Sequence, residues 1–206
     1  MTDTPAVVEP SNGGYPATFT FDPPEKVANW RPLVNWLLAI PHYAVLYALR
    51  ILGEVIAVIS WFAIVFTGKL PESFANIQSM WMRYELRVYP FAAFMREEYP
   101  PFAFTMSPSD HGEDARSTVE FRPELTDRNR LTVGFRLILV IPHVIVLVLL
   151  GIAAAVVALI GFFAVLFTGR WPTGLRDFVL NVYRWYLRVQ TYFLLLTDEY
   201  PPFQLS

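Results

Sequence analysis

Hydrophobic positions along the chain form two long blocks, and each block is followed by a segment in which hydrophobic and polar positions alternate with a helical period. The second block, residues 137–167, contains no Asp, Glu, Lys or Arg. About 20 helical residues cross a hydrocarbon core of about 30 Å, so a run of 18 or more apolar residues is a membrane candidate. The first block, residues 33–66, is similar but carries Arg50 and Glu54 four residues apart. The pattern predicts a membrane protein with two long apolar helices.

The segments that follow the two blocks predict amphipathic helices. In residues 174–196, apolar residues recur in steps of three and four, and the opposite face is polar. Residues 74–95 show the same pattern in the first half of the chain. Each polar face carries two arginines, and these are Arg83, Arg87, Arg184 and Arg188.

Short segments that open and close each half of the chain are predicted as strands. Apolar and polar residues alternate in residues 18–21 and 119–122, which is the period of a strand. Residues 102–104 and 203–205 each follow a Pro-Pro pair that cannot continue a helix. The four segments together predict one small β-sheet. This sheet must lie outside the hydrocarbon, because lipid cannot bond an open sheet edge.

The two halves are copies of one unit. Ile40-Pro41-His42 recurs as Ile141-Pro142-His143, and the same offset of 101 residues relates the later motifs, including Glu-Tyr-Pro-Pro-Phe near the end of each half. A tandem duplication of strand, apolar helix, amphipathic helix and strand follows. The predicted divisions are a disordered, acidic tail without signal-peptide features (1–15), a first membrane repeat (16–106), a polar linker (107–116) and a second membrane repeat (117–206).

Two arrangements of each repeat in the bilayer fit this pattern. In the first, the apolar helix crosses and the amphipathic helix crosses back with its arginines turned inward. A charge at the bilayer centre costs about 2.5–3.5 kcal/mol on insertion scales, and this cost weighs against the first arrangement. In the second, the apolar run enters as a hairpin with Arg50, Gly53 and Glu54 at its tip, and the amphipathic helix lies flat at the headgroups. The second repeat has only Gly151 at the tip position. Both arrangements stay open, and crossing hairpins or a mixture of the two arrangements are preferred.

Prolines and basic residues add two local predictions. Pro41 and Pro142 should kink or break each apolar run near its start. Basic residues are concentrated on the side of the predicted strands, so the positive-inside rule places the termini and the sheet in the cytoplasm. These residues are Lys26, Arg31, Arg96, Arg116, Arg122, Arg128, Arg130 and Arg136.

Composition supports the membrane class and excludes several kinds of chemistry. A hydrophobic fraction of 54% and a mean hydropathy of +0.38 exceed what a soluble domain usually carries, so the excess is expected to face lipid. A net charge of −2 gives no basic surface for nucleic acid. The chain has no cysteine, and it contains no phosphate-binding glycine loop, nucleophile elbow or zinc helix motif. Neither an enzyme nor a cofactor is predicted.

Three groups of polar residues remain as candidate sites. His42 and His143 could bind a metal or move protons, but neither has a second ligand at metal spacing, so we interpret both as interfacial and predict no metal site. The four arginines of the amphipathic helices could bind lipid phosphates or an anionic substrate, or simply face the headgroups. Arg50 and Glu54 form an intramembrane polar pair, either functional or a local ion pair.

Three motifs of the second repeat give a family resemblance. Residues 166–172 (LFTGRWP), 185–190 (WYLRVQ) and 197–203 (TDEYPPF) resemble the bacterial membrane proteins grouped as domain-of-unknown-function family 4389. The resemblance covers the chain from about Phe19, once per repeat, although the first repeat departs from the pattern at Glu72 and Pro90. It implies an integral protein of the bacterial inner membrane, and it implies no activity.

Two functions therefore compete at the level of sequence. The preferred one is a non-catalytic scaffold or accessory subunit of a membrane complex, with lipids and either a protein partner or a second copy of the chain as partners. The alternative is a lipid- or small-molecule-binding or transport protein with an arginine-lined site between the repeats. A membrane enzyme that uses His42 or His143 ranks third.

Overall fold

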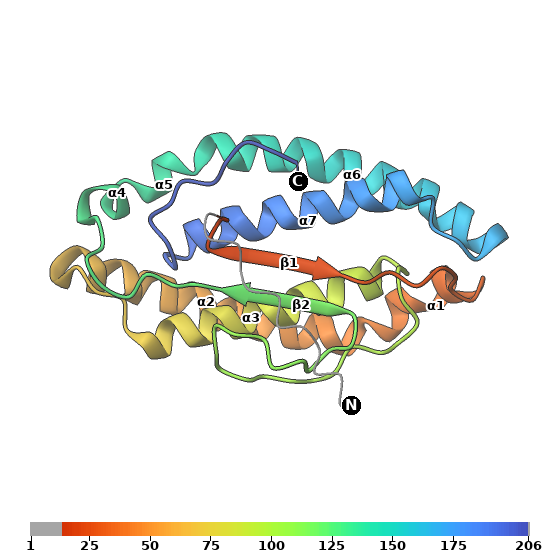
Figure 1. The fold of residues 1–206 in the computed structure, drawn as a ribbon, viewed down its shortest axis with the longest axis horizontal. Coiled ribbons are helices and arrows are strands. Elements are labelled where there is room, and N and C mark those ends of the chain that lie inside the picture. The colour runs from red at the N-terminus through yellow and green to blue at the C-terminus, as the bar shows by residue number, and fades with distance from the viewer. Residues whose placement is uncertain (1–13, 206) are drawn as a thin grey trace, which may run out of the picture.

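The computed structural model describes residues 14–205, which form a mainly helical protein with one small sheet (Figure 1). The first half contains β1 (Ala17–Phe21), α1 (Arg31–Leu38), α2 (Ile40–Thr67) and α3 (Glu72–Ala92). The second half contains β2 (Ser117–Phe121), α4 (Arg130–Gly134), α5 (Arg136–Leu139), α6 (Ile141–Thr168) and α7 (Thr173–Phe193). The predicted order of opening strand, apolar helix and amphipathic helix is confirmed in both halves. The predicted tail lies mostly in residues 1–13, outside the described residues.

Each long apolar helix starts at a proline and ends at a glycine. Pro41 and Pro142 lie in the first turns of α2 and α6, where a missing N–H removes no helical bond. The separation of α1 from α2, and of α5 from α6, confirms the predicted break near these prolines. Gly68 and Gly169 end the helices at φ values of 72° and 68°, a left-handed conformation that glycine adopts without a steric penalty.

The helices α2 and α6 are continuous over 28 residues each. The alternative arrangement, an apolar hairpin with its tip at Arg50, Gly53 and Glu54, is therefore wrong. Gly53 instead allows α3 to approach α2, because an added Cβ would overlap the indole ring of Trp81. Apolar side chains fill every turn of the segment, so nothing local interrupts the helix.

The sheet contains one strand from each repeat. β1 and β2 pair antiparallel, with Phe19 opposite Val119. Residues 102–104 and 203–205 do not join this sheet, so the prediction of closing strands, and with it a four-stranded sheet, is wrong for the described chain. Arginine side chains bind these segments instead: Arg87 donates to the carbonyl of Ala103 at 3.4 Å.

The long helices and the two strands share one long axis (Figure 1), and the contacts between them define three layers. β1 packs on α7 and β2 on α3, and these two helices pack in turn on α6 and α2. The main core lies on both sides of α3 and α7, and it includes Phe19, Tyr84, Leu86, Val119 and Leu187. The sheet and the outer surfaces of α2 and α6 therefore lie on opposite sides of the molecule.

The repeats are related by an approximate two-fold axis and run in opposite directions. The N–H of Val27 donates to Gly169 at the end of α6 (2.8 Å), and the N–H of Arg128 donates to Gly68 at the end of α2 (3.1 Å). α1 packs on α6, and α4 packs on α2. The start of each apolar helix thus lies beside the end of the other, so α2 and α6 are antiparallel (Figure 1).

Candidate functional site

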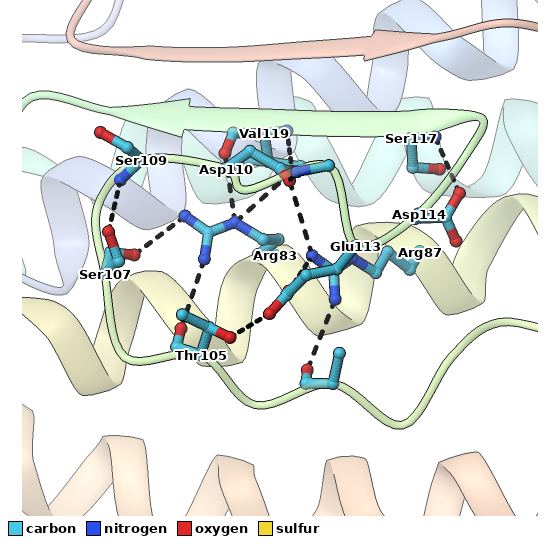
Figure 2. A network of polar contacts seen from close by, with 12 residues as sticks. Arg83, Arg87, Thr105, Ser107, Ser109, Asp110, Glu113, Asp114, Ser117 and Val119 are labelled. Carbon is cyan, nitrogen blue, oxygen red and sulfur yellow. Dashed lines mark hydrogen bonds and ion pairs between the residues drawn. The ribbon is translucent and has the colours of Figure 1, made fainter.

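Arg83 and Arg87 lie on the face of α3 that points toward β2, where both side chains are almost fully buried (Figure 2). Arg83 donates from Nε to the carbonyl of Val119 at 3.3 Å. Its Nη2 donates to the carbonyls of Ser107 at 2.9 Å and Pro108 at 3.0 Å. The predicted linker is therefore held against α3 and β2 by arginine side chains.

Two carboxylates of this linker balance the buried arginine charges. Oδ2 of Asp110 lies 3.6 Å from Nε of Arg83, and Oε2 of Glu113 accepts from Nη2 of Arg87 at 2.6 Å. Burial alone would raise the pKa of Glu113, but the Thr105 hydroxyl and Arg87 outweigh it and lower that pKa. A buried charge is tolerated when it is paired and hydrogen-bonded, so the linker is part of the fold. Sequence reasoning missed Asp110 and Glu113; their spacing of three residues was the available signal.

The same linker covers the outer edge of β2 (Figure 2). The N–H groups of β2 that point away from β1 each donate to the linker. Ser117 donates to Oδ1 of Asp114 (3.0 Å), Val119 to Oδ2 of Asp110 (3.1 Å) and Phe121 to the carbonyl of Pro108 (3.0 Å). An unpaired strand edge is a template for further pairing. The linker removes that exposed template from β2.

Arg184 and Arg188 occupy the matching positions on α7. Arg184 donates from Nε to the carbonyl of Phe19 at 3.1 Å, as Arg83 does to Val119. Its Nη1 donates to the side-chain oxygen of Asn181 at 2.6 Å. Arg188 donates to the carbonyl of Gln204. Within residues 14–205, Arg184 makes no ion pair, and burial lowers its pKa because the charged guanidinium is poorly solvated.

A cavity of about 290 Å³ lies beside these two arginines. Its walls are Tyr15, residues 17–20 of β1, Arg184 and Arg188. The N–H of Asp22 and the carbonyl of Pro16 form hydrogen bonds to the residues that flank β2. The backbone N–H and carbonyl groups of even-numbered residues in β1 therefore point toward β2, and the N–H of Phe19 points away from it. The cavity therefore lies at the outer edge of β1, which corresponds to the edge that the linker covers on β2.

His42 and His143 are fully buried at matching positions. Their rings stack on Phe102 and Phe203, with centroids 4.4 Å and 3.9 Å apart. Nδ1 of each ring also bonds to an aromatic side chain of α3 or α7, namely Oη of Tyr84 at 2.6 Å and Nε1 of Trp185 at 3.3 Å. Among the described residues, no group of three or more His, Cys, Asp or Glu could hold a metal ion. The contacts of both histidines are those of aromatic packing residues.

Arg50 and Glu54 form an ion pair on the outer surface of α2. Nε of Arg50 lies 2.7 Å from Oε1 of Glu54, and the two side chains are 67% and 54% exposed. Successive residues of a helix are rotated by 100° around its axis. By this rotation, Arg50 and Glu54 lie at the margin of the exposed apolar face of α2, next to the partly buried Trp61, whereas Val55 lies near the centre of that face. The pair therefore flanks the apolar surface.

Glu85 is a buried carboxyl group between α3 and α7. Its side chain accepts from Oη of Tyr89, and Oη of Tyr186 lies 3.2 Å from both carboxyl oxygens. Tyr186 holds the position of Glu85 in the second repeat, so the cluster lies near the two-fold axis. Burial raises the pKa of Glu85 despite these hydrogen bonds. The arrangement favours the neutral acid.

A larger cavity of about 440 Å³ lies between the repeats, with walls from α2, α5 and the end of α7. Most of its lining is apolar, and Glu54 and Arg136 are the charged members. The apolar lining residues are Ala57, Val58, Trp61, Leu137, Phe193, Leu194 and Leu195. None of the four arginines on α3 and α7 belongs to this lining. The arginine-lined cavity of about 290 Å³, between β1 of the first repeat and α7 of the second, is therefore a separate one.

Comparison with known proteins gives one match. Residues 29–103 and 130–204 each match the sequence profile of a family described as Domain of unknown function (DUF4389). No curated protein and no solved structure shows significant similarity to the chain. Each matched segment spans the helices of one repeat and its closing segment, whereas β1, β2 and the linker lie outside both matches.

Proposed function

The chain belongs to the DUF4389 family, of which it carries two tandem copies, and from this premise we propose that it is a membrane-embedded, non-catalytic scaffold or accessory subunit. In this proposal α2 and α6 hold the protein in the bilayer, and the sheet side is presented to partners in water. The bacterial inner membrane, with the sheet side in the cytoplasm, is part of the proposal and follows from the family resemblance and the positive-inside rule.

The exposed surface of α2 and α6 carries this proposal. Only 22% of the most apolar window of α2, and 6% of that of α6, is buried. The core helix of a soluble protein would be mostly buried, and monomeric soluble proteins rarely expose large contiguous apolar patches. Exposed side chains on these helices include Val55, Val58, Phe62, Ile152, Leu159 and Phe163. Lipid is the solvent in which such a surface is stable.

The shared long axis of the layers favours α2 and α6 lying in the plane of the membrane. If they crossed the bilayer, the sheet and the polar linker would lie at hydrocarbon depth beside them (Figure 1). Open strand edges and charged side chains are not stable against lipid. With the helices in the membrane plane, the apolar surface faces lipid and the sheet faces water. We therefore propose the in-plane arrangement in place of the crossing that the sequence slightly favoured.

Accessibility labelling of single cysteines tests this orientation, because the native chain has none. Lys69 and Arg170 follow the ends of the antiparallel helices α2 and α6. Cysteines at these two positions should react with an impermeant maleimide from the same side of the membrane if the helices lie in the plane. Reaction from opposite sides would show crossing helices and would overturn the proposed orientation. Recovery of the purified chain as a monomer with catalytic turnover would contradict the non-catalytic role.

Binding of a lipid or another apolar molecule is the second candidate function, and the cavity of about 440 Å³ favours it. Substitution of Val58, which lines this cavity, by Trp should reduce its volume and the amount of lipid that remains bound during purification. Val55→Trp is the matched control, because Val55 lies on the same helix outside the cavity. Native mass spectrometry measures the bound lipid, and equal retention by both variants would argue against this function.

A further inference from the structure

We propose that the outer edge of β1, together with Arg184 and Arg188, is a docking groove for an acidic peptide segment of a partner protein. This inference rests on the proposed scaffold function and names the chemistry of the partner. The groove lies on the sheet side of the molecule, opposite the apolar surface of α2 and α6, so in the proposed orientation it opens to water.

The first repeat shows what this architecture binds. There, the matching groove between α3 and β2 holds an acidic segment of the chain itself, with Asp110 and Glu113 as its carboxylates (Figure 2). The segment uses two kinds of contact: its backbone carbonyls accept from Arg83, and its side chains accept from Arg87 and from the N–H of Val119. One groove thus binds both backbone carbonyls and negative charge.

The groove between α7 and β1 contains the same binding groups. Arg184 makes the same bond to β1 that Arg83 makes to β2. The outward N–H of Phe19 corresponds to that of Val119, which binds Asp110 in the first repeat. A cavity of about 290 Å³ lies where the linker lies in the first repeat. Its volume, its donor groups and its positive charge match the segment that fills the other groove.

An acidic peptide segment is the ligand that satisfies all of these groups. Its backbone carbonyls would accept from Arg184, as those of Ser107 and Pro108 accept from Arg83, and its carboxylate would accept from the outward N–H of Phe19, as that of Asp110 accepts from Val119. Its carboxylate would accept charge-assisted hydrogen bonds from Arg184, which are about twice as strong as neutral ones. Two acidic residues three positions apart, as in the linker, provide the expected pattern.

The linker itself supplies the probe for a binding experiment. A fluorescent synthetic peptide with the sequence of residues 105–116 is titrated with the 206-residue chain in lipid nanodiscs, and anisotropy is measured. The proposal predicts saturable binding that weakens as salt is raised. A control peptide with the substitutions Asp110→Asn and Glu113→Gln should bind roughly tenfold or more weakly, because hydrogen bonds to charged groups are lost. Equal binding of both peptides would overturn the proposal.

Variants of the protein locate the binding on the molecule. Arg184→Gln should weaken binding of the acidic peptide by a similar factor, whereas Arg176→Gln should leave it unchanged. Arg176 lies on the same helix and pairs only with its neighbour Asp177 among the described residues. Thermal unfolding of each variant verifies that it is folded. If the Arg184→Gln variant does not fold, the comparison of the acidic and control peptides on the native chain decides the question. Unchanged binding by a folded Arg184→Gln variant would overturn the proposal.

The N-terminal segment of the chain is the competing occupant, because it precedes β1 as the linker precedes β2 and carries Asp3 and Glu9. If the acidic peptide binds only to a variant with Asp3→Asn and Glu9→Gln, the groove serves the chain itself and the partner proposal is overturned. Binding to the native chain supports a partner. The membrane proposal fails separately, through the cysteine labelling described above, so the two outcomes are distinguishable.

Discussion

Arg83 and Arg184 hold the same position in two copies of one unit, and each binds a backbone carbonyl of the strand above it. Their surroundings differ because the linker before β2 brings Asp110 next to Arg83. Helical periodicity correctly places these arginines on a polar helix face. It does not show whether that face meets headgroups, water or a strand, since this depends on segments distant in sequence.

Asp110→Asn is predicted to destabilise the protein. Asparagine keeps the size of the side chain and one acceptor oxygen, but it removes the negative charge beside two buried arginines. Loss of a partner for buried polar groups costs about 1–3 kcal/mol. Thermal unfolding in detergent measures the effect, and Asp127→Asn, at an exposed position, is the control. Equal midpoints for the two variants would show that the linker is not held by this charge.

Glu85→Gln is predicted to flatten the dependence of stability on pH. Because burial raises the pKa of Glu85 in the folded protein, its contribution to stability is fully present below the ordinary value of 4.5 and is lost as the pH rises through the folded-state pKa. Glutamine is a neutral mimic of the acid and should remove this loss. Unfolding midpoints between pH 4 and pH 8 measure the slope. Glu25→Gln, at an exposed position, should leave the slope unchanged.

The helices could be predicted from sequence because their signals are local. Apolar blocks, prolines in the first turn and glycines after the last turn define α2 and α6 without reference to other segments. The strands depended on distant partners: β1 pairs with β2 across one hundred residues, while residues 102–104 are bound by Arg87 and have no strand beside them. A Pro-Pro pair shows where a helix cannot continue, but it does not show what the extended chain will bind.

Two glycines of α6 are predicted to respond in opposite ways to substitution by alanine. An added Cβ at Gly161 would overlap the indole ring of Trp171, so Gly161→Ala should destabilise by about 1–3 kcal/mol through overpacking. An added Cβ at Gly151 meets nothing within 4 Å, so Gly151→Ala should stabilise by about 0.5–1 kcal/mol through helix propensity. Thermal unfolding of both variants measures the difference. A stabilised Gly161→Ala variant would show that α6 and the Trp171 loop are not in close contact.

At the scale of the whole molecule, the two-fold relation between the repeats constrains how the protein meets a membrane. The antiparallel apolar helices share one side, the sheet and linker share the other, and α3 and α7 separate them. Because α2 and α6 run in opposite directions, a crossing arrangement would invert one repeat relative to the other. The in-plane arrangement gives both repeats the same environment, which is consistent with the similar apolar and polar surfaces of the two units.

Depth measurements along α6 distinguish these arrangements directly. Ile145, Ile152 and Phe163 are exposed and lie within about 20° of one another around the helix, at 100° per residue. A helix rises about 1.5 Å per residue, so a crossing α6 would spread nitroxide labels at these positions over about 27 Å of depth. An in-plane α6 should hold all three at nearly equal depth. Electron paramagnetic resonance with oxygen and a water-soluble nickel complex as relaxation agents measures depth. Labels at Thr18 and Thr20, exposed on β1, should report water throughout, since the sheet faces away from the lipid.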